Sequence, residues 1–115
     1  MPHKPTGYII ILMTAPSKGE ARRIASALVR KKLAACGNII AGVESLFRWK
    51  SKIEKAREVL VLLKTKTSLF GDVVSEIERL HSYEVPEIIA VPIAAGNEKY
   101  LKWIHSTVLK NENKH

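Results

Sequence analysis

The 115-residue sequence contains a single cysteine, Cys36, which limits what can crosslink the fold. One cysteine forms no disulfide within the chain and cannot by itself build a cysteine-only zinc site. We therefore expect a reducing, cytoplasmic setting in which any metal is bound by histidine, carboxylate, methionine or a partner chain. A chain of this length can bury roughly two-thirds of the surface it exposes when unfolded. One domain over residues 1–115, with an ordered core over about 8–108, can therefore do without crosslinks.

Long apolar runs are also absent. No stretch approaches the roughly 20 apolar residues that a membrane-spanning helix needs. The opening segment Met1–Pro5 has no apolar signal core behind it. We therefore expect neither a membrane span nor Sec export.

Two segments near the N-terminus have clear structural signatures. The continuous apolar run Tyr8–Met13 predicts a central strand that is buried on both faces. Ser17 and Glu20 form a capping-box pattern, in which each side chain binds the other residue's backbone N–H. The apolar residues that follow recur every three or four positions and predict a helix with a buried stripe of Ala21, Ile24, Ala25, Leu28 and Val29.

The next segment predicts a long hairpin. Residues 36–38 interrupt the helical pattern, an extended stretch from about Ile39 to Trp49 follows, and Lys50-Ser51 is the predicted turn. A strand from Ile53 ends in the apolar run Val59–Leu63, which predicts a second central strand. Both strands exceed the usual five or six residues. We therefore expect the hairpin to project past the sheet and to be covered by other subunits.

A second helix is predicted from apolar residues at helical spacing. Thr67 or Ser68 can cap it, and it extends to about Leu80. Glu76 and Glu78 are expected on its solvent side. Its predicted buried face consists of Leu69, Val73, Ile77 and Leu80.

The C-terminal third predicts one strand and one helix. Glu87–Ile93 is the strand, and its Pro92 favours an edge position. Asn97 caps a short last helix before a frayed tail over Lys110–His115. The complete order is β-α-β-β-α-β plus a C-terminal helix, with the first and third strands the most apolar. This order predicts an α+β, ferredoxin-like split βαβ fold.

Acidic residues are few: 11 Asp and Glu stand against 19 Lys and Arg, which gives a net charge of +8. A basic chain can bind nucleic acid, although charge runs are more often solvated faces. RNA-recognition modules of this fold stack bases on aromatic residues of their central strands. The third predicted strand instead carries Lys55, Arg57, Val59 and Val61. We therefore expect no specific nucleic-acid partner.

One short segment concentrates metal-binding side chains. His81, Tyr83, Glu84 and Glu87 lie within seven residues, around Pro86. Imidazole and carboxylates can bind Cu²⁺ or Zn²⁺. The spacing is not specific, because His81 also suits a helix C-terminus, Tyr83 a packed ring with a tethered hydroxyl, and Glu84 a solvated loop. No nucleophile is paired with a base, so we predict no enzyme activity.

Five ordered segments stand out along the chain: Ala34-Ala35-Cys36-Gly37-Asn38-Ile39, Trp49-Lys50-Ser51-Lys52-Ile53-Glu54, Leu63-Lys64-Thr65, His81-Ser82-Tyr83-Glu84-Val85-Pro86-Glu87 and Tyr100-Leu101-Lys102-Trp103-Ile104. Together they resemble the CutA divalent-cation tolerance family, over about Ile9 to Ile104. The resemblance implies a ferredoxin-like subunit in a tight homotrimer, with long hairpins and sheet edges contacting neighbours. It also implies binding of divalent metals, notably copper.

The resemblance further implies a ligand pocket near subunit boundaries, at Cys36, Asn38, Trp49, Lys64, Tyr83, Pro86 and Glu87. His81 and Glu87 would be the first metal ligands, with Glu84 secondary. The chain departs from the family where Ser82 replaces the usual Pro and Ser51 the usual Gly, and also at Arg48, Gly37 and Met13.

The leading hypothesis is a trimeric protein that binds divalent metal ions and contributes to metal tolerance without catalysis. The alternative is a signalling module similar to PII proteins, which bind small anionic ligands in clefts between subunits. Its charge-assisted donors would be Lys50, Lys52, Lys64 and Lys66. A scaffold for membrane or protein partners is the third possibility.

Overall fold

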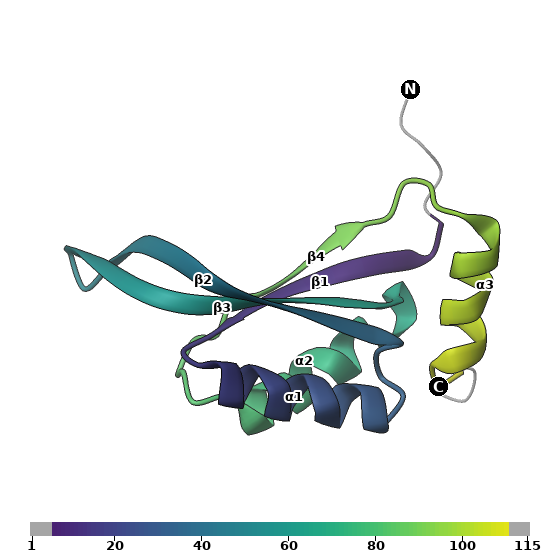
Figure 1. The fold of residues 1–115 in the computed structure, drawn as a ribbon, viewed down its shortest axis with the longest axis horizontal. Coiled ribbons are helices and arrows are strands. Elements are labelled where there is room, and N and C mark those ends of the chain that lie inside the picture. The colour runs from purple at the N-terminus through teal and green to yellow at the C-terminus, as the bar shows by residue number, and fades with distance from the viewer. Residues whose placement is uncertain (1–5, 111–115) are drawn as a thin grey trace.

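The computed structural model describes residues 6–110 and has the predicted α+β architecture. Its four strands form one antiparallel sheet in the order β2-β3-β1-β4, with three helices (Figure 1). The predicted ferredoxin-like order, the central β1 and β3 and the edge position of β4 are confirmed. The elements are β1 (Tyr8–Ala15), α1 (Lys18–Arg30), β2 (Cys36–Trp49), β3 (Lys52–Lys66), a 3₁₀ turn η1 (Thr67–Leu69), α2 (Phe70–Leu80), β4 (Ile88–Pro92) and α3 (Glu98–Thr107).

Helices α1 and α2 cover one face of the sheet, and α3 lies at one end of it (Figure 1). The core between sheet and helices is built from buried residues of β1 and β3, namely Ile9, Ile11, Met13, Val59, Val61 and Leu63. The opposite face, here called the open face, is apolar but less covered. Its residues are the half-buried Ile10, Leu12, Leu60 and Leu62 and the exposed Ile40, Ile89 and Val91. The expectation that β1 is buried on both faces is therefore wrong for a single chain.

The β2–β3 hairpin projects past the sheet, as predicted. β1 pairs with β3 only over Val59–Lys66, so the rest of the hairpin extends beyond the other strands (Figure 1). Lys50 and Ser51 form the predicted turn with φ angles of 50° and 66°. Positive φ at both positions is typical of a two-residue type I′ hairpin turn.

A β-bulge in β2 determines which side chains share the open face. Ile40 pairs with Leu60 and Val43 with Glu58, so β2 has one extra residue in this interval. Gly42, at φ 80°, accommodates the extra residue. Because side chains alternate along a strand, the insertion moves the later odd-numbered residues, Phe47 among them, onto the same face as Ile40.

Residues 36–38 lie outside α1, as predicted, but they already belong to β2, which corrects the predicted start of the extended stretch at about Ile39. They pair with the stretch Leu62–Lys64 of β3. A Cβ atom at Gly37 would approach Leu63 Cδ2 to 3.2 Å and Ala25 Cβ to 3.4 Å. Glycine is accommodated within this strand because α1 packs closely over it.

The helix caps agree with the sequence only in part. Ser17 Oγ accepts the Glu20 N–H at 3.2 Å, as predicted, but the Glu20 carboxylate binds Ser82 instead of returning to Ser17. Lys66 and Leu69 occupy the N-cap positions of η1 and α2, which corrects the predicted cap at Thr67 or Ser68. The predicted Asn97 cap is confirmed, whereas Val29, expected in the α1 stripe, is 41% exposed.

Glu76 is buried against α1 rather than solvated. Its carboxylate accepts hydrogen bonds from Lys31 Nζ at 2.7 Å and from Arg79 Nη2 at 2.8 Å. The pair of cations compensates the charge, so the side chain can lie between α1 and α2. Glu78, two residues later, is exposed as predicted.

None of the helices within residues 6–110 combines the length and apolar character that crossing a membrane requires. The predicted frayed tail, beyond Lys110, lies outside the described residues. So does the opening segment Met1–Pro5, on which the expectation about Sec export rests.

Candidate functional site

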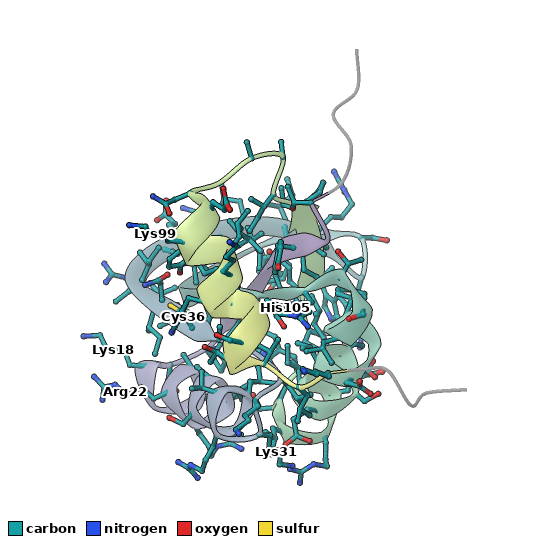
Figure 2. The ribbon with its side chains drawn as sticks, turned by 90° about the vertical axis from the view of Figure 1, so that its right-hand side faces the viewer. Lys18, Arg22, Lys31, Cys36, Lys99 and His105 are labelled. Carbon is teal, nitrogen blue, oxygen red and sulfur yellow. The ribbon has the colours of Figure 1, made fainter. Side chains whose placement is uncertain are left out.

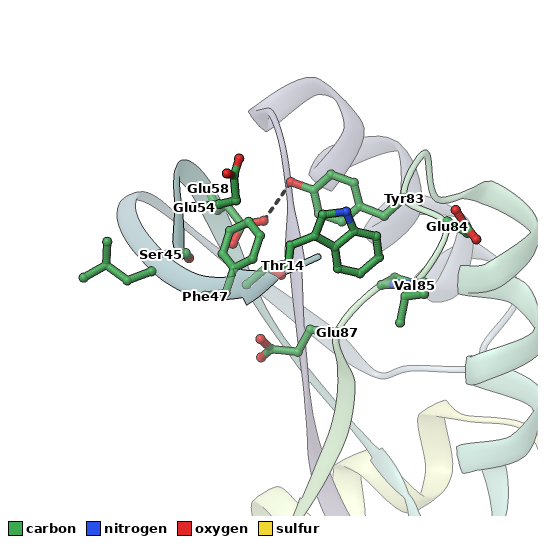
Figure 3. A pocket seen from close by; sticks show the side chains of 12 residues that line it. Thr14, Ser45, Phe47, Glu54, Glu58, Tyr83, Glu84, Val85 and Glu87 are labelled. Atoms are coloured by element: carbon green, nitrogen blue, oxygen red, sulfur yellow. Dashed lines mark hydrogen bonds between the residues drawn. The ribbon is translucent and has the colours of Figure 1, made fainter. Parts of the chain in front are cut away.

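A cavity of about 690 Å³ lies between the projecting hairpin and the loop that joins α2 to β4 (Figure 3). Its walls come from three parts of the chain that are far apart in sequence. The lining residues are Thr14 of β1, Ser45, Leu46, Phe47, Trp49, Glu54 and Glu58 of the hairpin, and Tyr83, Glu84, Val85, Pro86 and Glu87 of the loop.

The cavity lining contains four carboxylates and no lysine or arginine. This local charge is opposite to the net +8 of the whole chain. The lining also includes the aromatic residues Phe47, Trp49 and Tyr83, and Figure 3 shows Phe47 and Tyr83 on either side of Thr14. An acidic cavity with aromatic walls suits a cationic ligand.

Tyr83 ties the loop to the hairpin. Its hydroxyl donates a hydrogen bond of 2.7 Å to Glu58 Oε2, drawn as a dashed line in Figure 3. Burial, reinforced by this carboxylate, raises the pKa of Tyr83 to about 12. The tyrosine is therefore a neutral donor at ordinary pH, and the sequence-based interpretation of a tethered hydroxyl is confirmed.

His81 faces the fold rather than the cavity. Its Nε2 lies 2.7 Å from the Thr14 carbonyl oxygen, and its Nδ1 lies 3.0 Å from the Tyr83 N–H nitrogen. With these partners Nε2 donates to the carbonyl oxygen and Nδ1 accepts from the Tyr83 N–H. Both nitrogens are thus engaged, and the ring holds Tyr83 in place instead of pointing at Glu84 and Glu87.

Glu20 supports the same loop from α1. The backbone N–H and the hydroxyl of Ser82 each donate to its carboxylate at 2.8 Å. Burial alone would raise the pKa of Glu20, but the hydrogen bonds from Ser82 outweigh it and hold the pKa below its ordinary value. Proline, the usual residue at this position in the resembling family, could not donate the backbone bond.

The remaining residues of the predicted pocket lie elsewhere. Lys64 Nζ donates to Asn38 Oδ1, and Cys36 Sγ lies 3.9 Å from the same oxygen. Cys36, which is labelled in Figure 2, also contacts Tyr100 of α3, where burial and then the thiol raise the pKa of the tyrosine. Lys64 is six residues from Glu58 on β3, or roughly 20 Å at the usual rise per residue. Within one chain, Cys36, Asn38 and Lys64 therefore lie apart from the cavity that Trp49, Tyr83 and Pro86 line.

The carboxylates of one chain do not converge on a point. Among residues 6–110, no three His, Cys, Asp or Glu side chains are placed to hold one metal ion. Glu84 and Glu87 line the cavity, but His81, predicted as a first ligand together with Glu87, is not in its lining. The single chain thus has an acidic cavity without a compact metal site.

The lysines of the alternative anion site are also separated. Lys50 and Lys52 lie at the hairpin turn, whereas Lys64 and Lys66 lie at the other end of β3. Twelve residues separate Lys52 from Lys64, or roughly 40 Å of extended strand. One chain does not bring these cations together.

Sequence reasoning missed Thr14, Glu54 and Glu58 as cavity residues. The two glutamates lie on one side of β3 because they are four residues apart in a strand. That alternation is visible in the sequence. Their meeting with Phe47 and Tyr83 is not, because it depends on the bulge in β2 and on the loop after α2.

Comparison with known proteins identifies relatives of the whole domain. Residues 9–107 match the model of the family described as "CutA1 divalent ion tolerance protein". The "Divalent-cation tolerance protein CutA" of Thermus thermophilus is 46% identical over 95 residues, which cover 83% of this chain and 92% of that relative. Human "Protein CutA" is 44% identical over 100 residues, or 87% of this chain, and the match spans only 56% of the human protein.

Solved structures agree with this relationship. The crystal structure of CutA1 from Oryza sativa superposes with a TM-score of 0.89 at 37% identity, covering 95% of this chain and 98% of that one. The structure of "Divalent cation tolerance protein (Cut A1)" from Thermus thermophilus gives a TM-score of 0.87 at 44% identity, covering 88% and 98%. With the sheet order, the long hairpin and the family match over residues 9–107 in agreement, the chain belongs to the CutA1 divalent ion tolerance protein family.

Proposed function

We propose that the protein binds divalent metal ions, copper among them, as a homotrimer, and contributes to tolerance of these ions without catalysis. The observation that carries the proposal is the cavity, whose lining has four carboxylates and no basic side chain. Carboxylate oxygens bind divalent cations. Glu87 and Glu84 are the proposed first ligands, and Glu58 lies across the cavity from the loop.

The proposed role is binding rather than chemistry. The relatives that the chain matches are described by divalent-cation tolerance and not by an enzymatic reaction. His81 takes a positioning role in this proposal, because its hydrogen bond to the Tyr83 N–H orients the loop that carries Glu84 and Glu87.

The homotrimer is supported by the apolar surface that one chain leaves uncovered. The open face includes Ile89 and Val91, which are 52% and 46% exposed, and the hairpin adds Leu46 at 62% and Ile53 at 69%. Exposed apolar side chains on both the open face and the hairpin favour burial against neighbouring copies. The number of three copies comes from the resemblance to the CutA family. A neighbouring copy could also add the ligands that a single chain lacks.

Calorimetric titration with Cu²⁺ tests the metal site. We expect saturable binding that weakens about tenfold in Glu87→Gln, because a ligand carboxylate is lost. Glu44→Gln is the matched control: it removes the same charge from an exposed residue of β2 outside the cavity lining. Cu²⁺ binding that is unchanged in both Glu87→Gln and Glu84→Gln would rule out this site.

Light scattering after size-exclusion chromatography tests the assembly. We expect three times the chain mass of 12.9 kDa. Leu62→Glu puts a charge in the middle of the open face and should reduce the mass, whereas Val29→Glu, on an exposed position of α1, should not. A monomeric wild-type protein would contradict the proposed trimer.

A further inference from the structure

We propose that the solvent-facing side of α1 binds the phosphate backbone of double-stranded nucleic acid without reading its sequence. This surface, here called the basic face, consists of the exposed residues Lys18, Arg22, Ser26 and Arg30. It lies on the side of the sheet opposite to the open face (Figure 1). Because neighbouring copies of the proposed trimer would cover the open face and the hairpin, we expect the basic face to stay accessible. The inference does not depend on metal binding.

The four-residue spacing of the basic face aligns its side chains in one stripe along the helix. Lys18 and Arg22 are one turn apart, and Figure 2 shows both extending from the same side of α1. At the usual rise per residue, Arg30 lies roughly 18 Å along the axis from Lys18. Duplex DNA carries one phosphate charge per about 1.7 Å of its own axis, so roughly ten phosphates lie along a stripe of this length. The three cations can therefore contact phosphates at the same time.

The cations of the basic face are not used by acidic side chains of the chain itself. No ion pair within residues 6–110 involves Lys18, Arg22 or Arg30. Glu20, the one acidic residue in the α1 sequence, accepts hydrogen bonds from Ser82. Lys18 also lies in the first turn, where a cation opposes the helix dipole, so helix stability does not account for its charge. These cations are therefore available to an external anion.

The composition of the basic face favours one class of polyanion. Two of its three cations are arginines, whose planar guanidinium groups bind phosphate oxygens through paired hydrogen bonds. It has no aromatic residue on which the bases of a single strand could stack. The apolar side of α1, with Ala21, Ile24 and Leu28, is buried in the core, so no apolar side remains to enter a lipid bilayer. A duplex, whose phosphates are exposed while its bases are stacked inside, fits this surface best.

Fluorescence anisotropy with a labelled DNA duplex at several salt concentrations tests the inference. We expect saturable binding that is equal for two unrelated sequences, with a slope of log K against log salt of about −3 for three phosphate contacts. Arg22→Gln combined with Arg30→Gln should weaken binding and reduce the slope by about 2, and Arg22→Gln alone by about 1. Glutamine has nearly the helix propensity of arginine, so α1 should stay folded.

Lys52→Gln combined with Lys55→Gln is the matched control, because it removes the same charge from exposed positions of β3 in the hairpin. This variant should keep the slope of the wild type, and size-exclusion chromatography should give all variants the wild-type mass. Absence of saturable duplex binding overturns the inference. An equal loss in the two double variants does so too, because the duplex would then respond to the net charge of +8 and not to α1.

A parallel titration with phosphatidylserine vesicles distinguishes the duplex from a membrane surface. Binding to the vesicles without binding to the duplex would overturn the inference. Cu²⁺ binding should be the same in the α1 variants as in the wild type, so the outcome for the basic face and the outcome for the metal proposal are independent.

Discussion

Glu76→Gln should remove a pH-dependent part of the free energy of unfolding. The Glu76 carboxylate accepts hydrogen bonds from Arg79 and Lys31. The bond from Arg79 has the larger effect, and together they lower the pKa of Glu76 from 4.5 to about 2. A group whose pKa is lower in the folded than in the unfolded state stabilises the fold in its ionised form. The contribution is therefore complete above about pH 4.5 and is lost as the pH falls through about 2.

The magnitude follows from the shift and from the exposure of the partners. A displacement from 4.5 to about 2 corresponds to roughly 3 kcal/mol in the absence of screening. The Glu76 side chain is 10% exposed, but those of Lys31 and Arg79 are 53% and 60% exposed, so solvent weakens both pairs. We therefore expect Glu76→Gln to lower the free energy of unfolding by about 1–2 kcal/mol at pH 7.

Urea denaturation of wild type and variant at one protein concentration and low salt, from pH 7 to pH 2, measures this effect. The difference in free energy should shrink as the pH falls below about 4.5. Glu78→Gln, at an exposed position of the same helix, is the control and should change stability little. The reasoning is refuted if Glu76→Gln costs no more than Glu78→Gln at pH 7, or if its cost is constant down to acid pH.

Three further changes test the loop and the hairpin. Ser82→Ala removes the hydrogen bond from the hydroxyl to Glu20, and Ser82→Pro also removes the one from the backbone N–H. NMR titration should therefore show the Glu20 pKa rising from wild type to the Ala variant and again to the Pro variant. An unchanged Glu20 pKa in the Pro variant would contradict the role of these two hydrogen bonds. Lys50→Asn combined with Ser51→Gly places residues that tolerate positive φ in the turn, and thermal unfolding should show stabilisation of about 1 kcal/mol rather than a lower midpoint. Tyr83→Phe leaves its buried carboxylate partner without a donor and should cost about 1–3 kcal/mol at pH 7 in chemical denaturation. Because the pKa of Tyr83 is about 12, that cost should persist to about pH 10 and fall above it; a cost that is absent at pH 7 would disprove the role of the hydrogen bond.

The order and type of the elements could be predicted because they depend on local patterns. Apolar runs identified β1 and β3 as the central strands, and helical spacing identified most of the buried faces of α1 and α2. The Ser17 cap and the Lys50-Ser51 turn are likewise local, since each involves residues at most three positions apart. The start of β2 was not predicted because glycine is disfavoured within strands. The place of Gly37 in β2 depends on the close packing of α1 over this position, which the local sequence does not reveal.

The candidate site could be predicted only in part. Tyr83, Glu84, Pro86 and Glu87 form one short segment that sequence reasoning singled out, and all of them line the cavity. His81 belongs to the same segment, but its ring binds the carbonyl of a residue 67 positions earlier, which no local pattern predicts. Residues that are neighbours in sequence were therefore assigned to one site, whereas in the fold the His81 side chain lies outside the cavity.

The sequence by itself determined the family, the strand order and an acidic loop after the second helix, because each is carried by residues that are close together in the chain. Only the tertiary structure decided which charges are buried and which residues share a cavity. Glu76 is compensated by Lys31 from 45 positions away, and Tyr83 meets Glu58 across 25 positions. Such contacts depend on strand register and helix packing, so the acidic cavity forms only when the hairpin, its bulge and the loop are assembled in space.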